Sequence, residues 1–105
     1  MSDRSLQQTV VITNPQGFHF RPKAAVAQRA MTYQCDVRLH WNGQVFNGKS
    51  MLELLLLAAE QGQAVTVEAD GPDAAEALEA LTAILAAPGV DEATSEPSPP
   101  SVPNT

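Results

Sequence analysis

Apolar residues recur along this chain with two different periods, and the period changes several times. Val37, Leu39 and Trp41 alternate with polar neighbours, as do Val65 and Val67 further along. Alternation of this kind predicts strands that bury one face, while spacings of three and four residues predict amphipathic helices. The strands are expected over residues 6–13, 35–41, 44–47 and 65–69, and the helices over 22–32, 50–59 and a stripe from Ala77 to Leu85.

Turn and cap residues separate these segments. Asn14 to Gly17 has turn chemistry, and Asn42-Gly43 is a strong signal for a type I′ hairpin. Pro22 suits the first turn of a helix, and Ser50 with Glu53 matches a capping box. The resulting order, β-α-β-β-α-β-α, predicts an α+β fold in which helices cover one face of an antiparallel sheet.

The last part of the chain differs in composition. Residues 88–105 contain five prolines, several serines and threonines, and only two large apolar side chains, Val90 and Val102. A segment with so little to bury is expected to be a disordered tail. We therefore predict a flexible N-terminus at 1–5, one folded domain at 6–87 and an acidic, Pro/Ser-rich tail.

Charge divides the chain into two halves. Twelve acids against six bases give a net charge of −6, but residues 1–50 hold all six bases and two acids, a net charge of +4. Residues 51–105 hold ten acids and no base. An acidic second half would be repelled by phosphate backbones, so nucleic acid is not an expected partner. Any anion should be bound by the first half.

Cysteine, histidine and hydropathy exclude further classes. The lone Cys35 cannot form an internal disulfide, and one cysteine with two histidines gives no convincing structural zinc site. The apolar run from Leu54 to Ala59 is far shorter than a bilayer span, so no direct membrane insertion is expected. The first residues lack the apolar core of a signal peptide, which favours a cytoplasmic protein.

The candidate chemistry lies between the first strand and the first helix. His19 stands where the helix should begin, and backbone N–H groups at such an end attract anions. Histidine can act as a nucleophile and form a covalent intermediate. Arg21 can hold a phosphate with two hydrogen bonds, and Lys23 adds charge nearby. Taken singly, His19 and Arg21 are also common surface residues; their joint arrangement favours a phosphate site.

Two motifs resemble one known family. Gly17-Phe18-His19-Phe20-Arg21-Pro22 is similar to the active-centre signature Gly-hydrophobic-His-x-Arg-Pro of the HPr family, the phosphocarriers of the phosphoenolpyruvate-dependent phosphotransferase system. Asn47-Gly48-Lys49-Ser50-Met51-Leu52 resembles that family's Lys-Ser-hydrophobic segment. The resemblance covers about residues 6–86, and two motifs at the right spacing are more specific than either alone.

The resemblance implies a fold and a function. The family fold is an open-faced β-sandwich, a four-stranded antiparallel sheet of order 1-4-2-3 with three helices on one face. His19 would accept a phosphoryl group on Nδ1 from phospho-enzyme I and donate it to an enzyme IIA domain, with Arg21 stabilising the phosphate. No cofactor or metal is implied, and the protein would be a monomeric relay member rather than a stand-alone turnover enzyme.

The partner surface and a second phosphosite follow from the same resemblance. Ser50 is expected to cap a helix; in some relatives the matching serine is also a regulatory site phosphorylated by an ATP-dependent serine kinase. Leu55 is expected in the core, Phe20 and Met51 on the surface, and His40 on a solvated strand face. The docking surface is expected to combine Phe18, Phe20, Met51 and Leu52 with Arg21, Lys23 and Lys49; Leu55 is an alternative member, with the core favoured.

Two departures and several alternatives remain. Phe20 and Lys23 stand where small residues are common in the family, which bears on which partners fit. A regulatory binding domain that controls a kinase or transcription factor is an alternative to a carrier. A nitrogen-branch relay cannot be separated from the sugar branch by sequence. A structural interaction module without chemistry would require the His-x-Arg-Pro match to be accidental.

Overall fold

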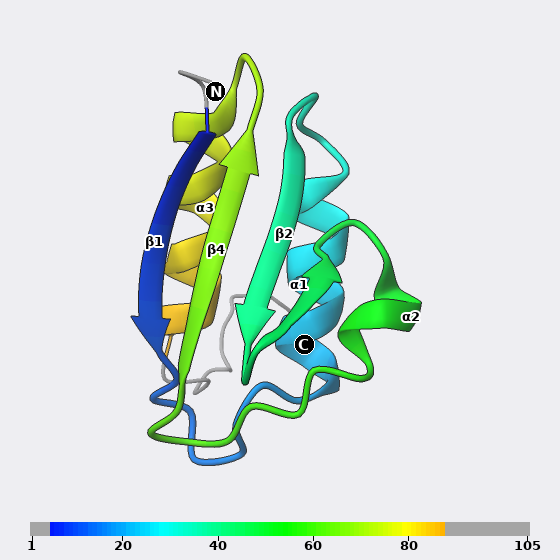
Figure 1. Ribbon diagram of the computed structural model, residues 1–105. Helices are drawn as coiled ribbons and strands as arrows, with labels where there is room; N and C mark the ends of the chain where they lie inside the picture. Colours follow the sequence, from blue (N-terminus) through cyan, green and yellow to red (C-terminus); the bar gives the residue numbers. More distant parts are fainter. Residues whose placement is uncertain (1–4, 88–105) are drawn as a thin grey trace, which may run out of the picture.

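The computed structural model describes residues 5–87 and contains four strands and three helices (Figure 1). The expectations for residues 1–4 and 88–105 lie outside the described residues, whereas Ser5 begins the first strand instead of ending a flexible segment. The elements are β1 (Ser5–Val11), α1 (Phe20–Ala30), β2 (Asp36–Trp41), β3 (Gln44–Asn47), α2 (Met51–Leu54), β4 (Ala64–Asp70) and α3 (Ala74–Ala86).

The strands form one antiparallel sheet in the order β1-β4-β2-β3, which confirms the predicted order. β4 lies between the first two strands and pairs Thr66 with Thr9 on one side and with His40 on the other. β2 and β3 form the predicted hairpin, in which Asn42 and Gly43 both adopt positive φ, as a type I′ turn requires.

Helices α1 and α3 cover one face of the sheet, and α2 lies at the side near β3 (Figure 1). The alternating apolar residues of β2 and β4 point to those helices, so Val37, Leu39, Val65 and Val67 are almost fully buried. Cys35 and Phe46 join this core, and Trp41 packs at its edge. Burial of these side chains supplies the main driving force for the fold.

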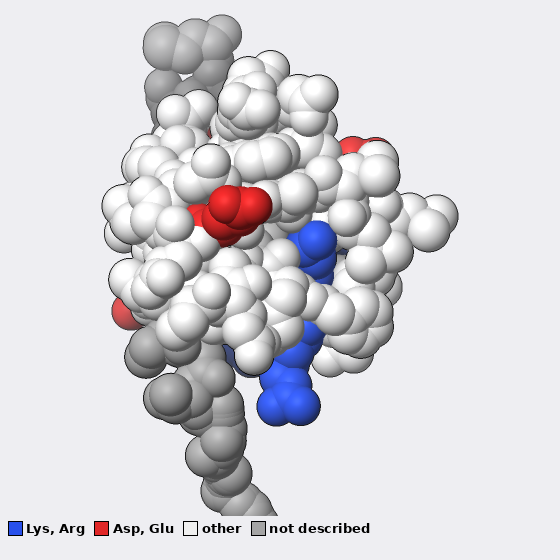
Figure 2. Space-filling view, turned by 90° about the horizontal axis from the view of Figure 1, so that it is seen from below, with Lys and Arg blue, Asp and Glu red and all other residues white. Residues whose placement is uncertain are grey.

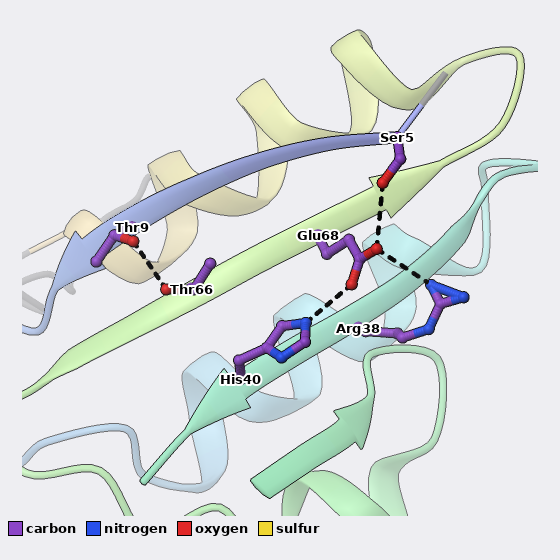
Figure 3. Close-up of polar contacts among 6 residues, drawn as sticks. All are labelled: Ser5, Thr9, Arg38, His40, Thr66 and Glu68. Atoms are coloured by element: carbon purple, nitrogen blue, oxygen red, sulfur yellow. Dashed lines mark hydrogen bonds and ion pairs between the residues drawn. The ribbon is translucent and has the colours of Figure 1, made fainter. Parts of the chain in front are cut away.

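The opposite face of the sheet is polar, and Glu68 is its centre (Figure 3). The Glu68 carboxylate accepts a hydrogen bond from Ser5 Oγ at 3.1 Å and contacts His40 Nε2 at 2.9 Å, with Arg38 Nη1 at 3.8 Å. The pKa of Glu68 lies below its usual range despite partial burial. The largest cause is the hydrogen bond with His40, and the hydrogen bond from Ser5 and the positive charge of Arg38 add to it. His40 lies on the predicted face of the sheet, but its side chain is half-buried and bonded to Glu68 rather than solvated.

α2 is much shorter than the predicted helix at 50–59. It ends because residues beyond Leu54 are used elsewhere: Leu57 and Ala59 are buried in the core, and the Ala59 carbonyl accepts a hydrogen bond from Phe18 N–H at 2.9 Å. A helix continued to residue 59 would point that carbonyl along its own axis. The apolar run therefore serves as a core-lining connection rather than as helix.

The predicted Ser50 cap forms, but it differs in detail from a capping box. Ser50 Oγ accepts from Glu53 N–H at 3.3 Å, while the Glu53 carboxylate reaches Asn47 N–H at 2.8 Å instead of returning to Ser50. Asp73 precedes α3 but does not cap it with its side chain; the carboxylate accepts from Gln34 and Cys35 N–H, both at 2.9 Å. These bonds stabilise the entrances to α2 and β2.

Three further properties of the described residues concern the Cys35 thiol, membrane crossing and metal binding. Burial, together with the hydrogen bond and charge of Asp73, raises the pKa of the Cys35 thiol to about 11. Across residues 5–87, no helix combines the length and the apolar character needed to cross a bilayer. The same part of the chain has no group of three or more His, Cys, Asp and Glu residues placed to hold a metal ion.

Candidate functional site

The loop between β1 and α1 is fixed at both ends by the segment that follows α2. Ile12 N–H donates to the Gln63 carbonyl at 2.9 Å, and Gly62 N–H donates to the Ile12 carbonyl at 2.8 Å. Further along, Phe18 N–H donates to Ala59. The two loops lie together at the lower end of the molecule (Figure 1). The loop that carries His19 is therefore ordered by main-chain bonds before any side chain contributes.

Gly17 is the position where this loop tolerates no other residue without cost. Its φ of +73° lies in the left-handed region, and a Cβ there would stand 2.7 Å from the Ala59 carbonyl oxygen. Both the backbone conformation and the close approach thus require glycine. The turn is closed by a hydrogen bond from Gly17 N–H to the Asn14 carbonyl at 2.8 Å.

His19 is the N-cap residue of α1, which confirms its predicted place at the helix start. Its backbone is extended, its carbonyl accepts from Lys23 N–H at 3.1 Å, and its side chain forms no capping hydrogen bond. No acidic residue occupies the first turn. The positive end of the helix dipole is therefore left for an anion at the half-buried His19 ring.

Nδ1 of His19 lies between a donor and an acceptor. The Gly17 carbonyl oxygen is 3.2 Å away and the Asn14 side-chain nitrogen 3.4 Å away. Asn14 is buried, and because its oxygen accepts from Gln16 N–H at 2.9 Å, its NH₂ group faces the ring. When Nδ1 carries a proton it donates to the Gly17 carbonyl; when it carries none it can accept from Asn14, which leaves the proton on Nε2.

Asn14 is the site residue that sequence reasoning treated only as part of a turn. The available signal was its position: an asparagine just before Pro15 commonly hydrogen-bonds the backbone two residues on. Such a bond directs the amide nitrogen outward. Its distance of five residues from His19 gave no indication that the turn would bring the two side chains together.

A cleft of about 690 Å³ opens beside His19. Its charged or titratable lining consists of His19 and the exposed Arg21, and it contains no acidic side chain. The remaining walls come from the loop between β1 and α1 (residues 12–19, the site loop), from α1 and from the end of α3. They are Asn14, Gln16, Phe20, Pro22, Ala25, Ile84 and Ala87. The structure thus places His19 and Arg21 in one cleft, as expected for a phosphate site.

Phe18 and Lys23 are not on the surface, contrary to their expected place in a docking surface. Phe18 is 3% exposed and Lys23 8%. Lys23 lies over the Phe18 ring, with its ammonium group 5.8 Å from the ring centroid, and donates to the Leu55 carbonyl at 3.3 Å. Burial lowers the pKa of Lys23. These residues connect α1 to the end of α2 and support the site from within.

The other expected contact residues do form an exposed apolar surface over α1 and α2. Phe20 is 66% exposed and Leu52 79%, while Met51 is half-buried against the core. Leu55, expected in the core, is 47% exposed because α2 ends before it. Lys49 and Met51 line a shallow depression with Met31, the residue that follows α1. Lys49 Nζ donates to the Tyr33 carbonyl at 2.8 Å.

Charge is distributed unevenly around the end of the molecule that carries the site loop. Seen from below, lysine and arginine atoms form one strip, while acidic atoms show at scattered places outside it (Figure 2). The bases of the described chain all come from its first half, as the sequence indicated. A strip of this sign favours contact with anionic groups.

Comparison with known families agrees with this geometry. The family model described as "PTS HPr component phosphorylation site" matches residues 6–87. The phosphocarrier protein HPr of Cupriavidus necator is 40% identical over 71 residues, which cover 68% of this chain and 80% of that protein. The protein of the same name from Neisseria meningitidis serogroup A is 38% identical over 71 residues, with coverage of 68% and 80%.

Solved structures give the same picture. The phosphocarrier protein HPr of Bacillus anthracis superposes with a TM-score of 0.74 at 32% identity, covering 79% of this chain and 99% of that one. The catabolite repression protein Crh of Bacillus subtilis, described as a domain-swapped dimer, gives a TM-score of 0.61 at 39% identity, with coverage of 76% and 92%.

Proposed function

Since this chain belongs to the HPr family, we propose that it is a phosphocarrier in which His19 accepts a phosphoryl group from phospho-enzyme I and donates it to an enzyme IIA domain. The single observation that carries this proposal is the position of His19: the N-cap of α1, with Nδ1 facing Asn14 and with Arg21 in the same cleft. That arrangement joins a nucleophile to an anion site.

The proposed transfer needs no cofactor and no net proton release. The lone pair of unprotonated Nδ1 attacks the phosphorus of the donor phosphohistidine, a new N–P bond forms, and the donor's N–P bond breaks with its electron pair returning to the donor nitrogen. Nε2 of His19 keeps its proton throughout. Asn14 supports this tautomer because its NH₂ group donates toward Nδ1 at 3.4 Å.

Two features are proposed to stabilise the incoming charge. The first turn of α1 presents N–H groups with no acidic side chain beside them, and Arg21 can hold two phosphoryl oxygens. The Gly17 carbonyl works in the opposite direction, because its oxygen 3.2 Å from Nδ1 repels a phosphoryl group. Stabilisation by α1 and Arg21, opposed by repulsion from the Gly17 carbonyl, suits a phosphoryl group that must be both accepted and donated.

We propose that donors and acceptors dock on the apolar surface beside this site. Phe20, Met51 and Leu52 provide the apolar centre, with Leu55 and Met31 at its border. Arg21 and Lys49 provide cationic groups at its edge, which favours acidic partner surfaces. Phe18 and Lys23 contribute indirectly, through the packing of α1 against α2.

Ser50 is proposed as a regulatory phosphosite in addition to its cap role. It precedes α2, is half-buried, and its neighbours Met51 and Leu52 belong to the proposed docking surface. A phosphate there would add two negative charges next to a surface meant for acidic partners. An ATP-dependent serine kinase and phosphorylase would be the enzymes involved.

The setting of the proposed relay is cytoplasmic, with the chain acting as a monomer. A regulatory protein that uses the same surface without carrying flux is the alternative. Phosphoryl transfer separates the two, because only a carrier gives up the phosphoryl group of His19 to an acceptor at a useful rate. The sugar and nitrogen branches differ only in which enzyme I and enzyme IIA react.

Mass spectrometry after incubation with phosphoenolpyruvate and enzyme I tests the proposal. We expect an acid-labile adduct of roughly 80 Da, the mass of one phosphoryl group on a histidine nucleophile. His19→Ala should abolish it. His40→Ala is the matched control, since His40 is held by Glu68 on the far face of the sheet and should leave the adduct unchanged. An adduct that survives in His19→Ala would overturn the proposal.

A further inference from the structure

The described part of the chain ends at the wall of the His19 cleft. Ala87, the residue after α3, lines that cleft together with Ile84, His19 and Arg21. The end of α3 is held against the site loop by a hydrogen bond from Thr13 Oγ1 to the Ala86 carbonyl at 2.9 Å. The point from which residue 88 continues is therefore fixed beside the proposed phosphoacceptor.

Eighteen residues follow Ala87, and their charges complement those of the cleft. They include three acids, Asp91, Glu92 and Glu96, and no base. The cleft presents the guanidinium of Arg21, the His19 ring and the positive end of α1, without an acidic side chain in its lining. An acidic segment attached at the rim of a cationic cleft has a high effective concentration there.

The spacing along the chain puts the first two acids within reach of Arg21. Ala87 and Arg21 line the same cleft, and a sphere of its 690 Å³ is about 11 Å across. Asp91 is four residues beyond Ala87, and four extended residues span at most about 14 Å. Glu92 is one residue further along and is also within reach.

We propose that Asp91 and Glu92 of this chain compete with phosphoryl groups for Arg21, so that the segment after α3 acts as an internal brake on the His19 site. The apolar walls formed by Phe20, Pro22 and Ile84 favour the Pro88-Gly89-Val90 portion that precedes these acids. The occupant is the chain's own segment 88–92. The effect of this contact on phosphoryl transfer rests on the proposed phosphocarrier function, whereas the contact between segment 88–92 and Arg21 does not.

The contact is weak because it involves exposed charges, and it therefore depends on salt. At about 10 mM salt, where charges interact over about 30 Å, Arg21 is occupied by the tail for a substantial fraction of the time. A phosphoryl donor must displace it. At about 1 M salt the range falls to about 3 Å and the brake is released.

Full-length protein with Asp91→Asn and Glu92→Gln tests the contact directly. In ¹H–¹⁵N spectra at low salt, the backbone and side-chain N–H signals of Arg21 should move in the double variant, and the difference should vanish in about 1 M salt. Glu79→Gln, exposed on α3 and outside the lining of the cleft, is the control and should leave these signals in place. The shifts should be independent of protein concentration. Unchanged Arg21 signals, or shifts that appear only on raising the concentration, would overturn the proposal.

The rate of phosphoryl acceptance provides the second measurement. The double variant should accept a phosphoryl group from phospho-enzyme I about threefold faster at low salt, and at the parental rate at high salt. Equal rates at low salt, with the Arg21 signals also unmoved, contradict the brake. If no phosphoryl group is accepted by any variant, the phosphocarrier function fails, while the spectra still decide whether segment 88–92 occupies Arg21.

Discussion

At the scale of single residues, the site is built from groups whose roles depend on contacts distant in sequence. His19 and Arg21 could be identified from sequence because a motif of adjacent residues carries them. Asn14 could not, since its NH₂ group reaches His19 only through the turn that Gly17 closes. Lys23 was misplaced for the same reason: its partners, Phe18 and the Leu55 carbonyl, are identified only by the packing of two helices.

Replacement of Asn14 by alanine should slow phosphoryl acceptance at His19 by about tenfold, the equivalent of one lost positioning hydrogen bond. Quenched-flow reactions with phospho-enzyme I would give the rate of phosphoryl acceptance. Gln16→Ala is the control, because Gln16 lines the same cleft but contacts Asn14 only through its main-chain N–H. Equal rates of phosphoryl acceptance for the two variants would show that Asn14 does not position His19.

Gly17→Ala should lower the free energy of unfolding by about 3 kcal/mol, because the left-handed φ and the Cβ contact with Ala59 both oppose it. Gly43→Ala, which shares the positive φ but has nothing within 4 Å, should cost only about 1 kcal/mol. Urea titration measures both. If the two variants lose the same stability, the close approach of the loops contributes nothing.

At the scale of elements, periodicity identified every strand and helix, and its errors lie where packing overrides local pattern. The run after Ser50 has helical spacing, yet α2 stops at Leu54 because Ala59 must accept from Phe18. Leu55 is consequently exposed on the proposed docking surface rather than buried. Asp73 has the position of a cap, but its carboxylate bonds the entrance of β2, a partner that no local pattern indicates.

Ser50→Asp should fold as the parent does, because aspartate also caps a helix, and should slow phosphoryl acceptance by about fivefold through its added charge. Ser50→Asn keeps a cap without charge and should react at the parental rate. Circular dichroism checks the fold and transfer kinetics check the rate. A slow asparagine variant would show that the hydroxyl, rather than charge, matters.

Glu68 should make stability depend on acid pH. Its folded pKa lies below the unfolded value near 4.5, so its contribution is present above that value and is lost as pH falls through the folded pKa. Urea titrations at pH 6 and pH 3 should show that Glu68→Gln removes about 1 kcal/mol of this pH dependence. Glu79→Gln, exposed on α3, is the control. A variant with the parental pH dependence would contradict the network on the open face of the sheet.

At the scale of the whole molecule, the split of charge along the chain is kept only near the site. Arg21 lies in the acid-free His19 cleft, whereas Arg29 lines a depression with Glu76 and Glu79, and Arg38 pairs with Glu68 on the open face of the sheet. Seen from below, basic atoms form one strip and acidic atoms lie outside it (Figure 2). The sheet order and the single helical layer were predictable, because two family motifs fix the topology that contains them. The cleft between the site loop, α1 and the end of α3 was not, since three segments far apart in sequence enclose it.

The central claim is that Nδ1 of His19 forms the N–P bond. Long-range ¹H–¹⁵N correlation spectra of ¹⁵N-histidine-labelled full-length protein, recorded after phosphorylation by enzyme I and phosphoenolpyruvate, identify the bonded nitrogen by its coupling to ³¹P. The account predicts this coupling at Nδ1 of His19, with the proton retained on Nε2 and with His40 unaltered. Coupling at Nε2 of His19, coupling at His40, or phosphorus bonded to neither histidine would contradict it.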